Sequence, residues 1–299
     1  MPDADPVTAY VPMIASLRPD RGPVRRPKIA SPSMTDLAKY GPWAVIAGGS
    51  EGVGAEFARM LAEDGFNLVL LARKPGPLEA TAQLCRKLGV QVRTLAVDLV
   101  DGASTAQISE ATADLEVGLL IYNAGANTCG ERFLDAPLAE FQKVVELNVT
   151  RMMELVQHFG RPMAARGRGG ILLVGSLAGY AGSMRHTVYG GVKAYGRLFA
   201  ESLWLELRDY NVDVLELVLG VTRTPAMERA GLNFEAPGMR INDPAEVARE
   251  GLDHLGAGPV HVAGGNAERA EMNSAPDRAQ VVLKSDAAIR NLINQRAPQ

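Results

Sequence analysis

The sequence predicts a doubly wound α/β fold built on one parallel β-sheet. Short runs of Val, Ile and Leu alternate with segments of helical periodicity along most of the chain. The runs are almost continuously apolar, which is typical of strands buried on both faces of a sheet. Because crossovers between parallel strands are right-handed, helices cover both faces and ligands bind at the carboxyl ends of the strands. We therefore expect a Rossmann-like fold in a single domain.

The predicted elements alternate in a regular order. The first helical segment is Val53–Asp64, in which Phe57, Met60 and Leu61 share one stripe. The expected strands are Trp43–Gly48, Phe66–Ala72, Val92–Val97, Leu119–Asn123, Gly170–Ser176, Val212–Leu219 and Val260–Ala263. The other expected helices are Leu78–Lys87, Leu138–Phe159, Tyr189–Arg208 and Pro244–Leu255.

Composition limits the classes of function. The 299 residues are 47% hydrophobic and 22% charged, which is ordinary for a soluble globular protein, and the formal net charge is -3. Such a chain is not built to bind nucleic acid or anionic lipid, and its apolar runs are too short to span a bilayer. Cys85 and Cys129 lie in no CxxC or Cys/His cluster, so we expect no metal site and a reducing, cytoplasmic location.

Residues 1–33 differ in kind from the rest of the chain. They contain seven of the 18 prolines, and a basic stretch runs from Arg18 to Lys28. Proline removes backbone donors and opposes regular structure, so we expect a flexible extension ahead of a domain at 34–299. Two other interpretations stay open: an arm that becomes ordered on a partner subunit, or an upstream extension of a coding region whose natural start is Met34. Binding of a membrane or nucleic acid by the basic stretch is a weaker hypothesis.

A glycine-rich turn follows the first expected strand and opens a helix. It reads Gly48-Gly49-Ser50-Glu51-Gly52-Val53-Gly54. Glycines let the backbone approach a pyrophosphate, and the helix N-terminus supplies N–H groups and partial positive charge. The strand before it, the helix after it and its place near the start of the domain together indicate a dinucleotide site.

The end of the second expected strand indicates which dinucleotide binds. An NAD site usually has an acidic residue there for the ribose 2′-hydroxyl, whereas this chain has Arg73 and Lys74. Two cations suit a 2′-phosphate, which Arg can bind in a bidentate manner, so we favour NADP(H) over two merely solvated cations. Asp98, after the third strand, either accepts from the adenine amino group or caps a helix that starts near Ala103.

Tyr189 and Lys193 lie four residues apart at the start of a helix, so both side chains share one face. An ammonium beside a phenol stabilises the phenolate, and moving a tyrosine pKa from about 10 to about 7 takes roughly 4 kcal/mol. Such a tyrosine can exchange a proton with a substrate oxygen near neutral pH. The alternative is a chance helix pair.

Two further polar residues are candidates for the same site. Ser176 closes the fifth expected strand, where its hydroxyl either binds the substrate oxygen or simply ends the strand. Asn148 lies inside a long helix, although asparagine is a poor helix former. It is either a buried amide that bends the helix and holds a water connecting Lys193 to solvent, or a solvated residue on the helix surface.

From about Lys39 to Gly264 the chain resembles the short-chain dehydrogenase/reductase family, whose signature residues occur here in order. The shared set is Gly48–Gly54, Asp98, Tyr122-Asn123-Ala124-Gly125, Asn148, Ser176, Tyr189 and Lys193. The resemblance implies that Tyr189 is the catalytic acid/base, and that Lys193 binds the nicotinamide ribose and tunes Tyr189. It further implies that Ser176 orients the carbonyl and that Asn148 holds the water of a proton relay.

The same resemblance implies further contacts and an assembly. Thr222 and Thr224 match positions that touch the nicotinamide carboxamide and the pyrophosphate. The other implied cofactor residues are Leu99, Asn123, Ala124, Gly125 and Gly220. The family also implies a homodimer or homotetramer that forms through the two long helices.

The chain departs from the family pattern at positions away from the chemistry. Ala47 replaces a Thr before the glycine turn, Tyr122 replaces the first Asn of an NNAG motif, and Leu219 replaces the Pro of a Pro-Gly pair. A partial likeness to bacterial NADP-dependent 7β-hydroxysteroid dehydrogenases does not carry their substrate over. It rests on Lys39–Trp43, Glu51–Gly54, Leu219-Gly220 and Val262–Gly264.

The substrate wall is expected in Leu177–His186 and in a candidate lid at about 225–242, which has little regular pattern. Flexible apolar side chains there suggest an adaptable pocket, unless they pack in the core. They are Met184, Val188, Met227, Leu232 and Met239. His186 either meets a polar substrate group or lies on the rim. We expect a bulky lipophilic, steroid-like ketone, with a sugar or an acyl-carrier thioester as the alternatives.

The rival hypothesis from another class is a non-catalytic NADP-binding regulator or sensor on the same fold. A regulator has no reason to retain both Tyr189 and Lys193. The sequence therefore favours an NADP(H)-dependent oxidoreductase that interconverts a carbonyl and a secondary alcohol.

Overall fold

The computed structural model describes residues 35–232, 234–235 and 240–294. The expected extension, residues 1–33, lies outside these ranges, as do Met34 and Met239.

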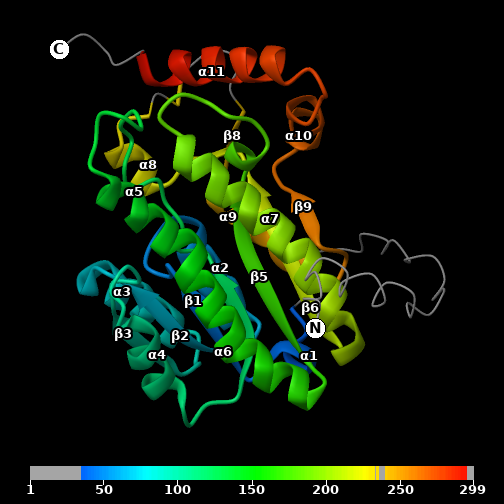
Figure 1. Ribbon diagram of the computed structural model, residues 1–299. Helices are drawn as coiled ribbons and strands as arrows, with labels where there is room; N and C mark the ends of the chain where they lie inside the picture. Colours follow the sequence, from blue (N-terminus) through cyan, green and yellow to red (C-terminus); the bar gives the residue numbers. More distant parts are fainter. Residues whose placement is uncertain (1–34, 233, 236–239, 295–299) are drawn as a thin grey trace, which may run out of the picture. The chain divides into compact units, whose positions relative to one another are not determined.

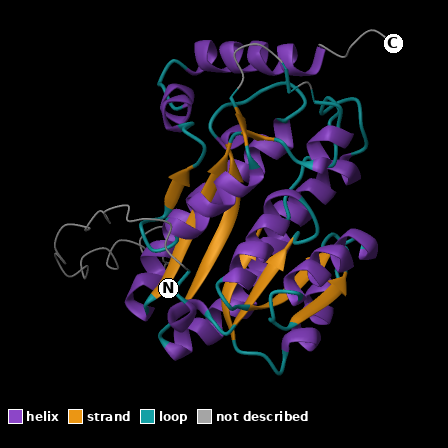
Figure 2. Cartoon of the chain, turned by 180° about the vertical axis from the view of Figure 1, so that it is seen from behind, coloured by secondary structure: helices purple, strands orange, loops and turns teal. Residues whose placement is uncertain are grey.

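In the described part of the chain a seven-stranded parallel sheet has the order β3-β2-β1-β4-β5-β6-β9 (Figures 1 and 2). Its strands are β1 (Trp43–Ala47), β2 (Asn67–Ala72), β3 (Val92–Ala96), β4 (Val117–Tyr122), β5 (Gly169–Ser176), β6 (Val212–Leu219) and β9 (Val260–Val262). The doubly wound fold and its predicted strands are confirmed, with ends shifted by one or two residues. Because β1 lies between β2 and β4, the winding reverses there, and the carboxyl ends on either side of the reversal are where ligands bind in such folds.

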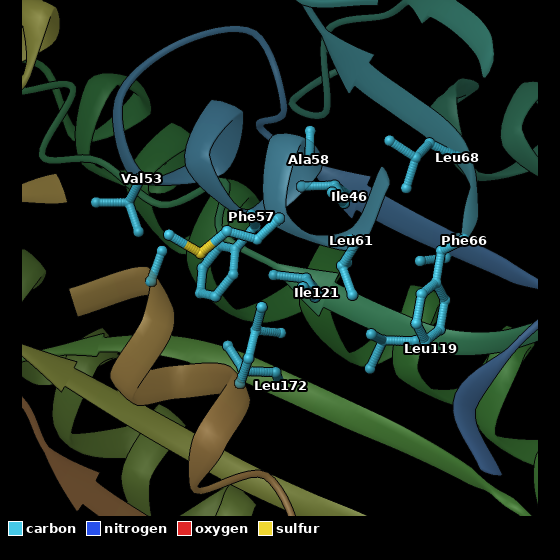
Figure 3. Packing of buried hydrophobic residues seen from close by; sticks show 14 of the residues in the cluster. Ile46, Val53, Phe57, Ala58, Leu61, Phe66, Leu68, Leu119, Ile121 and Leu172 are labelled. Atoms are coloured by element: carbon cyan, nitrogen blue, oxygen red, sulfur yellow. The ribbon is translucent and has the colours of Figure 1, made fainter. Parts of the chain in front are cut away.

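Helices cover both faces of the sheet because successive strand residues point to opposite sides. In β1, Ala44 and Ile46 pack beneath α2 (Gly52–Glu63), α3 (Pro75–Arg86) and α9 (Pro244–Asp253). Figure 3 shows Ile46, Phe57 and Leu61 among the side chains that fill this layer. Val45 and Ala47 belong to a second layer beneath three other helices. These are α4 (Ser104–Thr112), α6 (Arg151–Arg166) and α7 (Thr187–Leu207).

The helix expected at Leu138–Phe159 is present but interrupted. It consists of α5 (Leu138–Val145), a π-helical turn over Glu146–Thr150, and α6, which continues past Pro162. The Asn148 side-chain amide donates to the Val144 carbonyl (2.9 Å), and the Tyr122 hydroxyl donates to the Leu147 carbonyl (2.6 Å). These side-chain donors compete with main-chain donors for helix carbonyls, which accounts for the extra residue in the turn.

The candidate lid was expected to have little regular structure, and this expectation is wrong at both ends of the segment. Pro225–Arg229 forms a short helix, α8, because Thr224 caps it by accepting from the Met227 N–H (3.3 Å). Ile241–Asn242 forms a strand, β8, that pairs with β7 (Val221–Thr222). A five-residue helix and a two-residue strand are too short to leave a periodic signal in the sequence.

Three further helices were not expected from the sequence: α1 (Leu37–Tyr40), α10 (Ala267–Asn273) and α11 (Arg278–Asn294). Helix α11 packs along the loop that follows β5 (Figure 1): Arg278 donates to the Tyr180 carbonyl (2.9 Å), and Asp286 accepts from the Met184 N–H (2.9 Å). None of the helices within the described ranges combines the length and the apolar character needed to cross a membrane.

Candidate active site

The glycine-rich turn joins the carboxyl end of β1 to α2 and can be formed only with glycines. Gly48 and Gly52 have φ values of +84° and +57°, a region that L side chains rarely adopt. A Cβ on Gly54 would lie 1.9 Å from the Gly48 carbonyl oxygen. The Asn123 side chain, at the end of β4, donates to that same oxygen (2.9 Å) and so holds the turn in place.

The start of α2 faces this turn with its N–H groups uncapped. Glu51 occupies the N-cap position but makes no side-chain capping bond. Its carboxylate instead pairs with Arg229 of α8 through two contacts, one of them Nη1 to Oε2 at 3.0 Å. The Thr224 methyl would lie 2.9 Å from a Cβ on Gly52, so the turn and the start of α8 are in contact. The close-packed glycines and open N–H groups fit the pyrophosphate of a dinucleotide.

Two exposed cations follow β2 at the edge of this site. No carboxylate of the described residues forms an ion pair with Arg73 or Lys74. Asp98 does not cap α4, so that alternative is wrong: its Oδ1 accepts from Val100 N–H (3.1 Å). Helix α4 begins only at Ser104, with Ala103 at its N-cap and no side-chain capping bond, and Asp101 Oδ1 accepts from Ala103 N–H (2.9 Å) just before it.

The structure brings Tyr189, Lys193 and Ser176 together at the carboxyl end of β5. Lys193 Nζ donates to the Val174 carbonyl (3.0 Å) and lies 5.7 Å from the centre of the Tyr189 ring. Burial raises the pKa of Tyr189, and hydrogen bonding with Ser176 opposes this shift. Ser176 Oγ also accepts from Ala178 N–H (3.2 Å), which caps the turn that follows the strand.

Lys193 is buried, and the protonation of its side chain depends on a neighbouring negative charge. Burial lowers the pKa of its ammonium to about 8, and the Glu216 carboxylate acts in the opposite direction. A neutral Lys193 would no longer stabilise a Tyr189 phenolate.

Asn148 is buried in the π-helical turn, so the alternative of a solvated surface residue is wrong. Its Nδ2 donates to the carbonyls of Ala126 (3.1 Å) and Val144 (2.9 Å). Its Oδ1 has no hydrogen-bond partner within the part of the chain that is described. A Cβ on Gly125 would lie 2.6 Å from Lys193 Nζ and 2.8 Å from Asn148 Oδ1, so both atoms border one small space that only glycine leaves open.

The remaining cofactor positions lie at the ends of the neighbouring strands. Leu99 is buried, and its carbonyl accepts from Arg151 Nε (2.9 Å). Thr222 is also buried and donates to the Gly220 carbonyl (3.3 Å). Ala124 lies in the loop after β4 and packs against the apolar layer that α6 and α7 cover.

The expected substrate side chains divide into exposed and packed ones. Met184 and Met227 are 38% and 41% exposed, whereas Val188 packs against the apolar cluster under α5. Leu232 is half-buried. His186 is half-buried with its ring centre 5.7 Å from that of Tyr189, and its Nδ1 lies 2.9 Å from Ser183 Oγ. Burial lowers the pKa of His186, so the imidazole is neutral near pH 7.

Two residues near the site were missed from the sequence. Tyr122 supports the turn that contains Asn148. The sequence pointed to it only because it replaces the first Asn of the NNAG motif of the family. Glu216 is only 2% exposed, and the signal for it in the sequence was a carboxylate with apolar neighbours on both sides within β6. Across the described residues, no group of three or more His, Cys, Asp or Glu is arranged to hold a metal ion.

Comparisons with known proteins agree with this geometry. A 7beta-hydroxysteroid dehydrogenase of Clostridium sardiniense is 29% identical over 248 residues, covering 82% of this chain and 95% of that protein. A very-long-chain 3-oxoacyl-CoA reductase of Podospora anserina is 33% identical over 231 residues, covering 75% of this chain and 68% of that protein. A short-chain dehydrogenase from Sphingobium yanoikuyae, solved in complex with NADPH, has a TM-score of 0.70 at 26% identity and covers 87% of this chain and 98% of its own.

The family profile described as "short chain dehydrogenase" matches residues 42–233, which include the glycine turn, Asn148, Ser176, Tyr189 and Lys193. The chain therefore belongs to the short-chain dehydrogenase family.

Proposed function

We propose that the protein is an NADP(H)-dependent oxidoreductase that interconverts a ketone and a secondary alcohol on a bulky lipophilic substrate. The observation that carries this proposal is the convergence of Ser176, Tyr189, Lys193 and Asn148 around the end of β5, next to a turn that fits a pyrophosphate. These four side chains come from three separate segments, so helix spacing alone does not account for their meeting.

In the reduction direction Tyr189 donates a proton to the carbonyl oxygen of the substrate. Its raised pKa keeps the phenol protonated near neutral pH, which is the form that this step requires. Ser176 hydrogen-bonds the same oxygen as charge develops on it. The Lys193 ammonium stabilises the phenolate that Tyr189 leaves behind. The orphaned Asn148 Oδ1 accepts from a water that returns the proton through Lys193.

The cofactor proposed for this site is NADP(H). When bound, the reduced nicotinamide supplies the hydride. Arg73 and Lys74 are exposed and have no carboxylate partner within the described ranges, so both are available for a 2′-phosphate. We infer that Asp98, which lies beyond the next strand, accepts from an adenine amino group. We place the nicotinamide against Gly220 and Thr222.

Two substrate classes are candidates. A steroid-like ketone is favoured by the exposed Met184 and Met227 and by the likeness to 7beta-hydroxysteroid dehydrogenases. A long-chain 3-oxoacyl thioester is favoured by the 33% identity with the fungal 3-oxoacyl-CoA reductase. The segment at about 225–242, anchored by the Glu51–Arg229 ion pair, is proposed as the lid over either substrate.

The experiment is a comparison of kcat/KM for oxo-steroids, aryl ketones and long-chain 3-oxoacyl thioesters, each with NADPH and with NADH. The proposal expects NADPH turnover with the oxo-steroids above the other classes. Higher turnover of the thioesters would mean that the substrate is a long-chain 3-oxoacyl thioester and not a steroid-like ketone. Tight NADPH binding without turnover of any class would favour the rival function, a regulator that binds the dinucleotide without catalysis.

We also propose a homodimer or homotetramer formed through α6 and α7. Along α7, Leu198 and Leu205 are 58% and 60% exposed, and Met153 on α6 is partly exposed. Apolar side chains exposed along adjacent helices are typical of a subunit interface. A Leu198→Glu, Leu205→Glu double variant should sediment as a smaller species than the parent protein, whereas an unchanged mass would place the interface elsewhere.

A further inference from the structure

A carboxyl group lies buried on the sheet face that α7 covers. Glu216 of β6 is 2% exposed, and on the same strand face Val212 and Val214 belong to an apolar cluster. Its Oε2 is buried and has no hydrogen-bond partner within the described residues. A buried carboxyl without a full set of partners is costly, so its presence calls for a functional explanation.

Two glycines make room for this carboxyl next to the candidate active site. A Cβ on Gly175 would lie 2.5 Å from Glu216 Oε1, and a Cβ on Gly196 would lie 3.3 Å from it. Gly175 immediately precedes Ser176 in β5. Gly196 lies on the same buried stripe of α7 as Lys193, three residues further along. The Glu216 carboxyl therefore occupies the space behind Ser176 and Lys193, between sheet and helix.

The charged groups that face Glu216 all come from α7. Lys193 and Arg197 favour its ionised form, and Glu201 opposes it. The Arg197 guanidinium lies 4.7 Å from the centre of the Tyr180 ring and 3.8 Å from Glu201 Oε1. Burial raises the pKa of Glu216 and lowers that of Lys193, and the opposite charge of each partner acts against the other's shift. Within the described part of β5, Gly175 and Ser176 place no charge against it.

We propose that Glu216 is a positioning residue that acts through Lys193: its carboxylate keeps the Lys193 side chain in the ammonium form and thereby sets the pH at which Tyr189 exchanges its proton. This inference rests on the proposed roles of Tyr189 and Lys193. Glu216 itself touches neither the substrate nor the cofactor in this account.

The direction in which the pKa of Tyr189 changes distinguishes a role through Lys193 from a direct effect of the Glu216 charge on Tyr189. Without the carboxylate, a buried Lys193 loses its proton at lower pH, and Tyr189 loses the cation that stabilises its phenolate. The pKa of Tyr189 then rises. A direct effect of Glu216 on Tyr189 has the opposite sign, because removing a negative charge favours a phenolate and lowers that pKa.

The test is a near-ultraviolet absorbance titration of the phenolate in the full-length protein with NADPH bound. Subtracting the titration of Tyr189→Phe in the same background isolates Tyr189 from the other tyrosines. In Glu216→Gln the Tyr189 step should move to higher pH by about one unit or more, the size of one charge acting over several ångströms in a partly buried site. Glu216→Asp retains the charge, so its Tyr189 step should lie close to that of the parent protein.

The matched control is Glu201→Gln, which makes the same charge change on the neighbouring helix at a carboxylate that is 39% exposed. It should move the step by less than about 0.3 units because solvent screens an exposed charge. If Glu216→Gln fails to fold, Glu216→Met replaces it, because an apolar side chain of similar volume is tolerated where a charge was buried. A Tyr189 step that stays unchanged or moves to lower pH in the folded variant would overturn the inference.

This titration needs no turnover, so its result is independent of whether a substrate has been found. Once a substrate is known, the pH profile of kcat/KM should show the same displacement in Glu216→Gln. A purely structural role would lower the free energy of unfolding and leave both readouts where they are in the parent protein.

Discussion

The two faces of the central sheet bury different kinds of side chain. Between the strands and α2, α3 and α9, the layer shown in Figure 3 consists of apolar residues such as Phe57 and Leu61. Against α4, α6 and α7, the described residues also bury Arg151, Lys193 and Glu216. Most strand residues of both faces are apolar, with Glu216 of β6 as a buried exception, whereas Arg151 and Lys193 come from helices.

These buried charged groups lie on the face that α4, α6 and α7 cover, which is the face that holds the candidate catalytic residues. Burying a charge or an amide is costly unless it has partners. On the second face Arg151 and Lys193 have partners, whereas Glu216 Oε2 has none among the described residues. Arg151 contacts Glu146 (2.6 Å) and the Leu99 carbonyl, and Lys193 contacts the Val174 carbonyl. We therefore expect substitutions under α2 to change stability and substitutions under α7 to change catalysis.

The largest expected effect is on the apolar face. Phe57→Ala removes a fully buried ring and should lower the free energy of unfolding by about 3–5 kcal/mol, because it removes apolar contacts and leaves a cavity. Chemical denaturation measures this loss. The kcat/KM of the folded fraction should be unchanged, and a large fall in it would break the division between the two faces.

The next effect is on the backbone of the glycine turn. Gly54→Ala places a Cβ 1.9 Å from the Gly48 carbonyl oxygen and should weaken NADPH binding about 100-fold or more, as measured by calorimetry. Gly76→Ala is the matched control, since a Cβ there meets nothing within 4 Å. Equal effects of the two substitutions would mean that the turn does not carry the pyrophosphate.

A smaller change is expected at the edge of the cofactor site. Arg73→Glu should reduce the preference for NADPH over NADH by about 10- to 100-fold, because it replaces a charge-assisted contact with a repulsion. Lys87→Glu makes the same charge change just after α3 and should leave the ratio of kcat/KM values as it is. A ratio unaltered in Arg73→Glu would remove Arg73 from the proposed 2′-phosphate site.

The smallest effect is expected at Tyr122, on the polar face. Tyr122→Phe deletes the hydroxyl that donates to the Leu147 carbonyl, at a cost of about 1 kcal/mol in unfolding free energy. Because this bond supports the turn that carries Asn148, kcat should fall severalfold while KM for NADPH stays constant. Unchanged kcat together with lost stability would make Tyr122 a structural residue only.

The sequence was sufficient for the features that depend on neighbouring residues. Continuous apolar runs predicted the strands, and the glycine turn followed from its place between a strand and a helix. Tyr189 and Lys193 were identified by their spacing, and the resemblance supplied Asn148 and Ser176 in the same order. Each of these signals is contained in a short stretch of chain, which is why it could be recognised without the structure.

The features that were missed depend on contacts between distant segments. The π-helical turn requires the Tyr122 hydroxyl, and the environment of Glu216 depends on Gly175 and Gly196. Helix α11 is positioned by the loop after β5, about 100 residues before it. Whether Asp98 caps a helix depended on where α4 begins, and α4 begins at Ser104 without a side-chain cap, which composition does not determine.

The central claim is that Tyr189 is the proton donor in an NADPH-dependent carbonyl reduction, and single-turnover oxidation of bound NADPH with the best ketone tests it most directly. Tyr189→Phe should lower the rate of this step by about 10²- to 10⁴-fold while NADPH affinity stays within about twofold of the parent value. A Tyr189→Phe protein that oxidises NADPH at the parent rate would contradict the account.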